Sequence, residues 1–117
     1  MSIPILAPLN DCAFVVQIKK VNSAGTMVAL DAGSGTAFIA DNDAPTATSI
    51  DNTLEVTPTY TGANGKWLVE FDAALLLPAL LASAFATATP YCIIQFTNGV
   101  RIAVELHYQA IKTVQPA

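Results

Sequence analysis

The chain has one histidine, His107, and any search for catalytic chemistry begins there. A serine hydrolase needs a nucleophile, a histidine base and an orienting carboxylate in contact. His107 falls on the polar side of an alternating segment, and no Gly-x-Ser-x-Gly motif supplies a serine nucleophile. The pattern favours a solvated surface histidine, so we expect that the protein is not an enzyme.

Two other segments contain residue types that bind phosphate or metal ions in other proteins. Residues 33–36 read Gly-Ser-Gly-Thr, but they lack the lysine of a P-loop and no helix follows, which favours a tight turn between strands. Asp41, Asp43 and Asp51 share one loop, yet their spacing is not that of an EF-hand, which favours a solvated loop. We therefore expect no metal and no cofactor.

The glutamates that could pair for sugar hydrolysis are Glu55, Glu70 and Glu105. Each falls on the outward side of a strand-like segment, and nothing in the sequence indicates a cleft between them. Sugar binding without catalysis commonly uses exposed aromatic rings, whereas the alternation places Trp67 and Tyr108 on apolar faces. The sequence offers weak support for either sugar chemistry.

Cys12 and Cys92 could in principle bridge two strands. The N-terminus has no basic region followed by a long apolar run, so we expect synthesis in a cytoplasm, where thiols stay reduced. Two buried thiols are the favoured interpretation. Without a Cys-x-x-Cys motif, a zinc site is disfavoured as well.

The charge balance excludes two classes of partner. Nine acidic residues against five basic ones give a net charge of −4, and the basic residues are scattered along the chain. A nucleic-acid binder needs clustered lysine and arginine, so we expect binding to neither nucleic acid nor an anionic membrane. The longest apolar stretch, residues 73–86, is too short to cross a bilayer and contains Pro78.

The elements that position these residues are mainly strands. Apolar and polar residues alternate in about seven short segments separated by turn residues, which is typical of half-buried strands. The segments are 12–21, 26–31, 36–40, 54–60, 66–71, 91–97 and 100–109. Residues 41–52 lack such a pattern and are expected to form a loop.

Residues 73–86 switch to helical spacing after Asp72, which can cap a helix. Pro78 forbids an undisturbed helix, so either a turn precedes a helix that begins at Pro78, or the helix kinks there. Short strands with one helix predict an all-β sandwich of two antiparallel sheets, in which the helix crosses from one sheet to the other. We predict an extended N-terminal arm (1–11), a sandwich domain (12–111) and a C-terminal tail (112–117).

The arm is the candidate binding element, because it carries apolar side chains on an extended segment outside the predicted sandwich. Its candidate partner-binding residues are Ile3, Pro4, Ile5, Leu6, Pro8 and Leu9. Burying the four aliphatic side chains yields roughly 6–12 kcal/mol, and ordering some nine backbone residues costs about 9–18 kcal/mol. The arm therefore either folds back on its own domain as an extra edge strand, or binds a neighbouring chain in a repetitive assembly. On the second interpretation, deleting residues 3–9 leaves the fold intact.

The run from Lys66 to Asp72, the leucine-rich helix and the Asn98-Gly99 hairpin together resemble the C-terminal half of immunoglobulin-like modules. The small size, low charge, Ala/Thr/Gly-rich strands and apolar arm are similar to small virion proteins of tailed phages, above all capsid decoration (cement) proteins. The resemblance implies an immunoglobulin-like sandwich, location on the capsid surface, and a homo-oligomer, with a trimer favoured. The implied partner is the major capsid protein or another virion protein.

Two alternatives remain open at this point. The first is another virion subunit, from the head–tail connector, the tail or a fibre. The second is a carbohydrate-binding, immunoglobulin-like adhesin module, which exposure of Tyr60 or Trp67 would favour.

Overall fold

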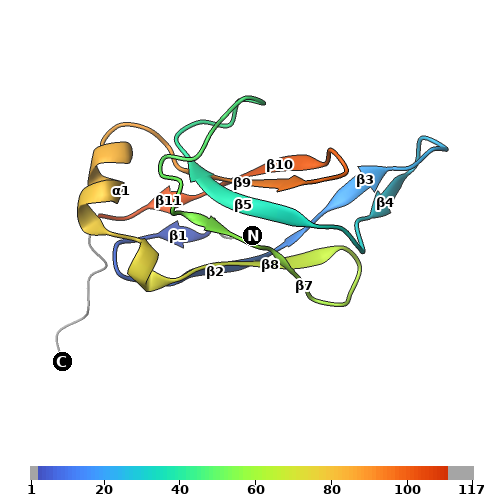
Figure 1. Cartoon of the computed structure of the whole chain (residues 1–117), viewed down its shortest axis with the longest axis horizontal. Helices are drawn as coiled ribbons and strands as arrows, with labels where there is room; N and C mark the ends of the chain where they lie inside the picture. Colours follow the sequence, from blue (N-terminus) through green and yellow to red (C-terminus); the bar gives the residue numbers. More distant parts are fainter. Residues whose placement is uncertain (1–2, 111–117) are drawn as a thin grey trace.

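The computed structural model describes residues 3–110, so the predicted tail (112–117) lies outside the described residues. Within this range the chain consists mainly of strands in several antiparallel sheets, with a single α-helix (Figure 1). This content of strands fits the predicted all-β class. The helix lies at one end of the long axis, and a projecting two-stranded hairpin lies at the other (Figure 1).

The larger sheet has the strand order β10-β9-β5-β6, and all its pairings are antiparallel. Its strands are β5 (Gly35–Ala40), β6 (Glu55–Val56), β9 (Tyr91–Phe96) and β10 (Arg101–Glu105). The turn between β9 and β10 is the predicted Asn-Gly hairpin, in which Gly99 has a φ of 95° and donates to the carbonyl of Phe96.

The second sheet has the order β2-β8-β7, with β2 (Cys12–Gln17), β7 (Thr59–Tyr60) and β8 (Lys66–Phe71). The predicted strand 54–60 is divided, because β6 belongs to the first sheet and β7 to the second. Pro58 lies between them, where the missing N–H of proline interrupts no ladder.

The predicted strand 12–21 changes neighbours at Ile18. The Ile18 N–H donates to the carbonyl of Gly65, and its own carbonyl accepts the N–H of Leu30, at 2.8 and 2.9 Å. Beyond Ile18 the chain continues as β3 (Lys19–Val21), which pairs with β4 (Met27–Ala29) in the projecting hairpin. Gly65 is required at this junction, since its φ is +71° and an added Cβ would lie 2.5 Å from the Ile18 carbonyl oxygen.

The connection between the sheets contains the helix. Asp72 accepts a hydrogen bond from the N–H of Ala74 and caps a short 3-10 turn, η1 (Ala73–Leu75). The α-helix, α1 (Pro78–Ala84), then begins at the proline. Of the two predicted alternatives, the turn followed by a helix from Pro78 is therefore confirmed. The connection leads from β8 to β9 and so crosses from one sheet to the other, as predicted.

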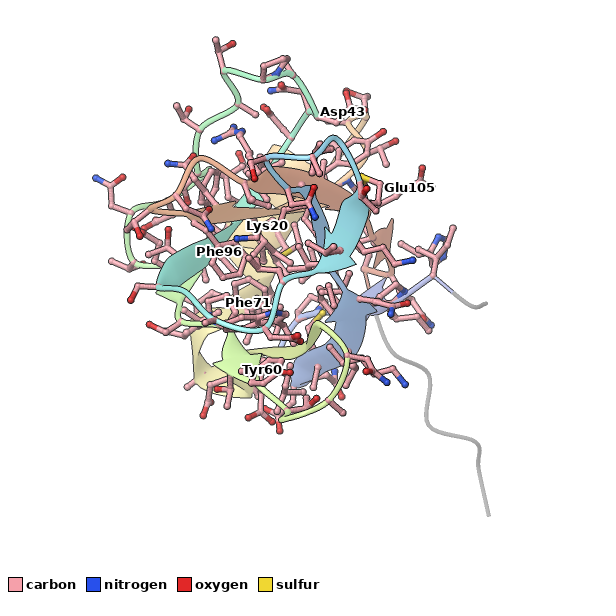
Figure 2. All side chains as sticks on the ribbon, turned by 90° about the vertical axis from the view of Figure 1, so that its right-hand side faces the viewer. Lys20, Asp43, Tyr60, Phe71, Phe96 and Glu105 are labelled. Atoms are coloured by element: carbon pink, nitrogen blue, oxygen red, sulfur yellow. The ribbon has the colours of Figure 1, made fainter. Side chains whose placement is uncertain are left out.

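Side chains from both sheets form one apolar core. Phe71 and Phe96 lie between the two layers in Figure 2, which views the molecule along its long axis. The rings of Trp67 on β8 and Phe96 on β9 meet edge to face with centroids 4.9 Å apart. The indole N–H of Trp67 donates to the carbonyl of Leu30 at 2.8 Å, so the buried ring leaves no polar atom unpaired.

Candidate partner-binding surface

The arm is joined to the domain by backbone hydrogen bonds. Residues Ile5–Leu6 form β1, which pairs in parallel with β11 (His107–Tyr108). The His107 N–H donates to the carbonyl of Pro4, and the Gln109 N–H donates to the carbonyl of Leu6, both at 2.9 Å. Of the two predicted alternatives, the structure has the arm folded back as an extra strand.

Leu6 is the arm residue that anchors this strand. Its side chain is fully buried and belongs to the main apolar core. The prediction that Leu6 contacts a partner is therefore corrected, because a side chain inside the core has no surface to offer. Deleting residues 3–9 would remove this buried side chain, so we expect the truncation to destabilise the fold. Pro4 and Pro8 are half-buried.

Three apolar side chains of the arm point into solvent. Ile3, Ile5 and Leu9 are 49%, 48% and 61% exposed, and we call them the exposed arm residues. The register explains the division, since pairing of Ile5 with His107 places both on the outer face while the next pair, Leu6 and Tyr108, faces inward.

Leu9 lies in a tight turn between β1 and β2. Its φ is 59°, in the left-handed region, and its N–H donates to the carbonyl of Leu76 at 2.8 Å. The side-chain amide of Asn10 donates to the carbonyl of Pro8 at 2.7 Å and closes the turn. The backbone of Leu9 is therefore fixed while its side chain stays exposed.

His107 lies beside a shallow hollow of about 290 Å³ between residues 85–90 and residues 105–108. Glu105, Thr87 and Thr89 line the same hollow. Both His107 and Glu105 are exposed, and Figure 2 places Glu105 at the outer edge of the sheet. Within residues 3–110 no hydrogen bond joins the imidazole to a carboxylate or a hydroxyl, so the hollow lacks an assembled nucleophile and base.

The segment 33–36 forms the turn into β5. The carbonyl of Ser34 accepts the N–H of Thr97 at 2.9 Å, and a Cβ on Gly35 would lie 2.8 Å from the ring of Phe96. The backbone of this segment is thus packed against β9. Gly35 is needed for the close approach of β5 to β9.

The loop aspartates bond locally. Asp41 accepts from the side chain of Asn42, and Asp51 accepts from the N–H and hydroxyl of Thr53. The two bonds from Thr53 lower the pKa of Asp51. Among the described residues no three His, Cys, Asp or Glu side chains gather as metal ligands do. Glu55, Glu70 and Glu105 are exposed and lie on three different strands.

Of the two aromatic residues named for the adhesin alternative, Trp67 is buried and Tyr60 is half-buried. Trp67 is 3% exposed, and half-buried Tyr60 packs on it with ring centroids 5.1 Å apart. The Tyr60 hydroxyl donates to Asp31 at 2.7 Å, and this bond is the main reason that the pKa of Tyr60 is raised. The buried ring of Trp67 is therefore not available to stack on a sugar, and the ring of Tyr60 is only partly exposed.

Cys12 and Cys92 come from the two facing sheets, and both are buried as free thiols. Burial raises the pKa of Cys12 to about 11. Burial, and to a lesser extent the proximity of Cys12, also raises the pKa of Cys92. Each thiol therefore stays protonated at neutral pH and packs as a small apolar group.

Sequence reasoning missed the contact that holds the 41–52 loop. The guanidinium of Arg101 donates to the carbonyl of Ala47 at 2.7 Å and to the side chain of Gln95, and it lies 5.8 Å from the centre of the Phe38 ring. The loop therefore covers the outer face of the larger sheet. No local pattern signals this contact, because the bonded residues are far apart in sequence.

Comparisons with protein-family models, with curated proteins and with solved structures found no match. No helix among residues 3–110 has the length and apolar character needed to cross a membrane.

Proposed function

We propose that this protein is a non-catalytic structural virion protein that decorates and stabilises a phage capsid by clamping neighbouring capsid subunits. The observation that carries the proposal is the arm, which displays Ile3, Ile5 and Leu9 to solvent on a backbone fixed to the domain. Exposed apolar residues on a fixed backbone are typical of contact surfaces between proteins. The resemblance in size, composition and arm to decoration proteins supplies the capsid as partner.

The finer description of the fold belongs to the same proposal. Sheets ordered β2-β8-β7 and β10-β9-β5-β6, with a parallel β1–β11 pair at one edge, are consistent with an immunoglobulin-like sandwich. The fixed arm also changes the energetics of binding. The entropy of ordering the arm is lost when the protein folds, so it no longer opposes binding.

The expected strength of one contact is modest. The three exposed arm residues each retain about half their surface, so burying them contributes roughly 2–5 kcal/mol in total. A single site of this strength is weak. Many copies that bind a repetitive surface, or an oligomer that engages several sites at once, would be retained much longer.

The test is binding of purified protein to expanded heads built from the major capsid protein of the same phage. Ile5→Asp places a charge on the outer face of the arm and leaves Leu6 in the core, so we expect normal folding and loss of binding. Thr59→Asp is the matched control, because Thr59 is exposed on β7 of the second sheet. If Ile5→Asp binds heads as well as Thr59→Asp does, the arm is not the contact.

A further inference from the structure

On one side of the run β2–β3, none of the strands formed by residues 3–110 pairs with it. Ile18 uses both its N–H and its carbonyl toward β8 and β4, so these two strands lie on the same side of the run. Backbone groups of successive residues alternate between the two sides of a strand. The N–H and carbonyl groups of Ala13, Val15, Gln17 and Lys19 therefore point to the opposite side, where none of the described strands pairs.

The β2 part of this free edge lacks the usual protection against pairing. Natural edge strands carry prolines, charges or bulges that discourage another strand from adding. Residues 12–18 contain no proline and no charged side chain. Val15 is 55% exposed at the centre of β2, and the inward side chains Phe14 and Val16 remain only half-buried.

We propose that the free edge of β2 pairs with the same edge of a second copy, antiparallel about a two-fold axis through Val15. The two three-stranded sheets then join into one sheet of six strands. This surface differs from the exposed arm residues, so the proposal does not depend on the decoration function. Its product is a dimer, whereas the sequence resemblance implies a trimer.

The side chains along β2 favour a second copy of the chain as the partner, and they favour one register of the pairing. With Val15 opposite Val15 of the second copy, Ala13 lies opposite Gln17 and Asp11 lies opposite Lys19. The two-fold axis repeats each pair, so two acidic residues meet two lysines at the ends of the joint. Asp11 Oδ1 accepts the N–H of Ala73 at 2.7 Å within its own copy, so it is the other carboxylate oxygen that pairs with Lys19. Phe14 and Val16 of opposite copies meet on the inner face, where each covers the exposed part of the other.

Other registers lose this match. A shift of two residues places Lys19 opposite Ala13 in one direction and opposite Leu9 in the other, and Asp11 then has no basic partner. A two-fold axis at Lys19 would place the two Lys19 side chains opposite each other, where their charges repel. A shift of one residue places outward side chains opposite inward ones, which the apolar inner face forbids.

The free edge of β10 is a poorer site for a second copy. Its Arg101 and Glu105 would pair across a two-fold axis at Ala103, but both terminal nitrogens of the Arg101 guanidinium are bonded within its own copy, to Gln95 and Ala47. Asp11 uses only one carboxylate oxygen within its own copy, for the N–H of Ala73. The edge is also blocked just after Glu105, where the His107 N–H donates to the carbonyl of Pro4.

The first test compares two substitutions of Val15 by sedimentation velocity over a concentration series. Val15→Pro removes an N–H that faces the free edge and leaves the pairing with β8 intact. Two backbone hydrogen bonds are then lost per dimer, so we expect the dimer dissociation constant to rise roughly tenfold or more. Val15→Thr keeps both shape and N–H and is expected to dimerise like the original protein. Circular dichroism checks that each variant folds.

The second test reverses the charges and does not depend on the proline variant. Asp11→Lys and Lys19→Asp should each weaken the dimer, and the double variant should restore it, with an effect that shrinks at high salt. Asp11→Lys also removes the acceptor of the Ala73 N–H, so circular dichroism of each variant separates loss of the dimer from loss of the fold. A dimer that is unaffected by the charge reversals and by Val15→Pro uses another surface and overturns the proposal. A protein that stays monomeric at its highest soluble concentration overturns it as well.

A covalent test locates the axis. Paired residues with mutual hydrogen bonds in antiparallel strands have Cα atoms about 5.5 Å apart, which a disulfide spans. Val15→Cys treated with the two-electron oxidant diamide should give a disulfide-linked dimer, while Thr59→Cys, exposed on β7, should not. The native thiols are buried and do not compete. Equal crosslinking of both variants, or none of Val15→Cys, contradicts the two-fold axis at Val15.

Discussion

Leu6 and Ile5 are neighbours on β1, and the structure gives them opposite roles. Leu6 is fully buried in the core, whereas Ile5 is 48% exposed. Leu6→Ala deletes buried methyl groups and leaves a cavity, which costs about 2–5 kcal/mol. Ile5→Ala removes side-chain atoms that are already half in water, so its cost should stay within about 0.5–1 kcal/mol.

The assay is urea unfolding of both variants, followed by Trp67 fluorescence. Trp67 belongs to the same core cluster as Leu6, so its signal reports loss of the packing that the arm completes. We expect the midpoint of Leu6→Ala to fall well below that of Ile5→Ala with a similar slope. If the two midpoints coincide, the arm is not part of the core, and the other alternative left open by the sequence, an arm that does not pack on its own domain, would be right.

Three further predictions concern the interior of the domain. Gly65→Ala should destabilise the fold by about 1–3 kcal/mol through backbone strain alone. The loss should exceed that of Gly62→Ala, because a Cβ at Gly62 has nothing within 4 Å. The midpoints of denaturant unfolding of the two variants test this order. Trp67→Phe leaves the carbonyl of Leu30 without its donor and should cost about 1–3 kcal/mol, whereas a cost under about 0.5 kcal/mol would contradict the role of this bond. Burial raises the pKa of Cys12 in the folded state to about 11, from an ordinary value of 9.0. The unfolded chain therefore loses this proton first, so the free energy of unfolding should fall as pH rises from 9.0 to about 11. Cys12→Ala should reduce that fall, and an unchanged pH profile would contradict the assignment.

The strands could be predicted from the sequence because each is set by its own alternation. Lys66–Phe71 is the strand that the pattern of Trp67, Val69 and Phe71 predicts, and all three side chains are buried. The start of the helix at Pro78 was one of two alternatives, since proline fits the first turn of a helix but not its interior. Local sequence features were therefore enough to predict this strand and to narrow the start of the helix to two alternatives.

The state of the arm could not be predicted in the same way. Ile5 and Leu6 are both aliphatic, so only the position of β11, about a hundred residues later, decides which of them is buried. The free edge of β2 depends on strand order, which no local pattern encodes. The sequence did place Ala13, Val15, Gln17 and Lys19 on one face, and the structure adds that no strand in the described part of the chain pairs with their backbone groups on the outer side.

An electron cryomicroscopy map of expanded heads saturated with this protein would test the central claim most directly. Ile3, Ile5 and Leu9 should lie against a capsid subunit at junctions between neighbouring subunits, with Leu6 still inside its own domain. A map in which the arm faces solvent while another face of the domain touches the capsid would contradict the claim, and heads that carry no bound copies would contradict the decoration function itself.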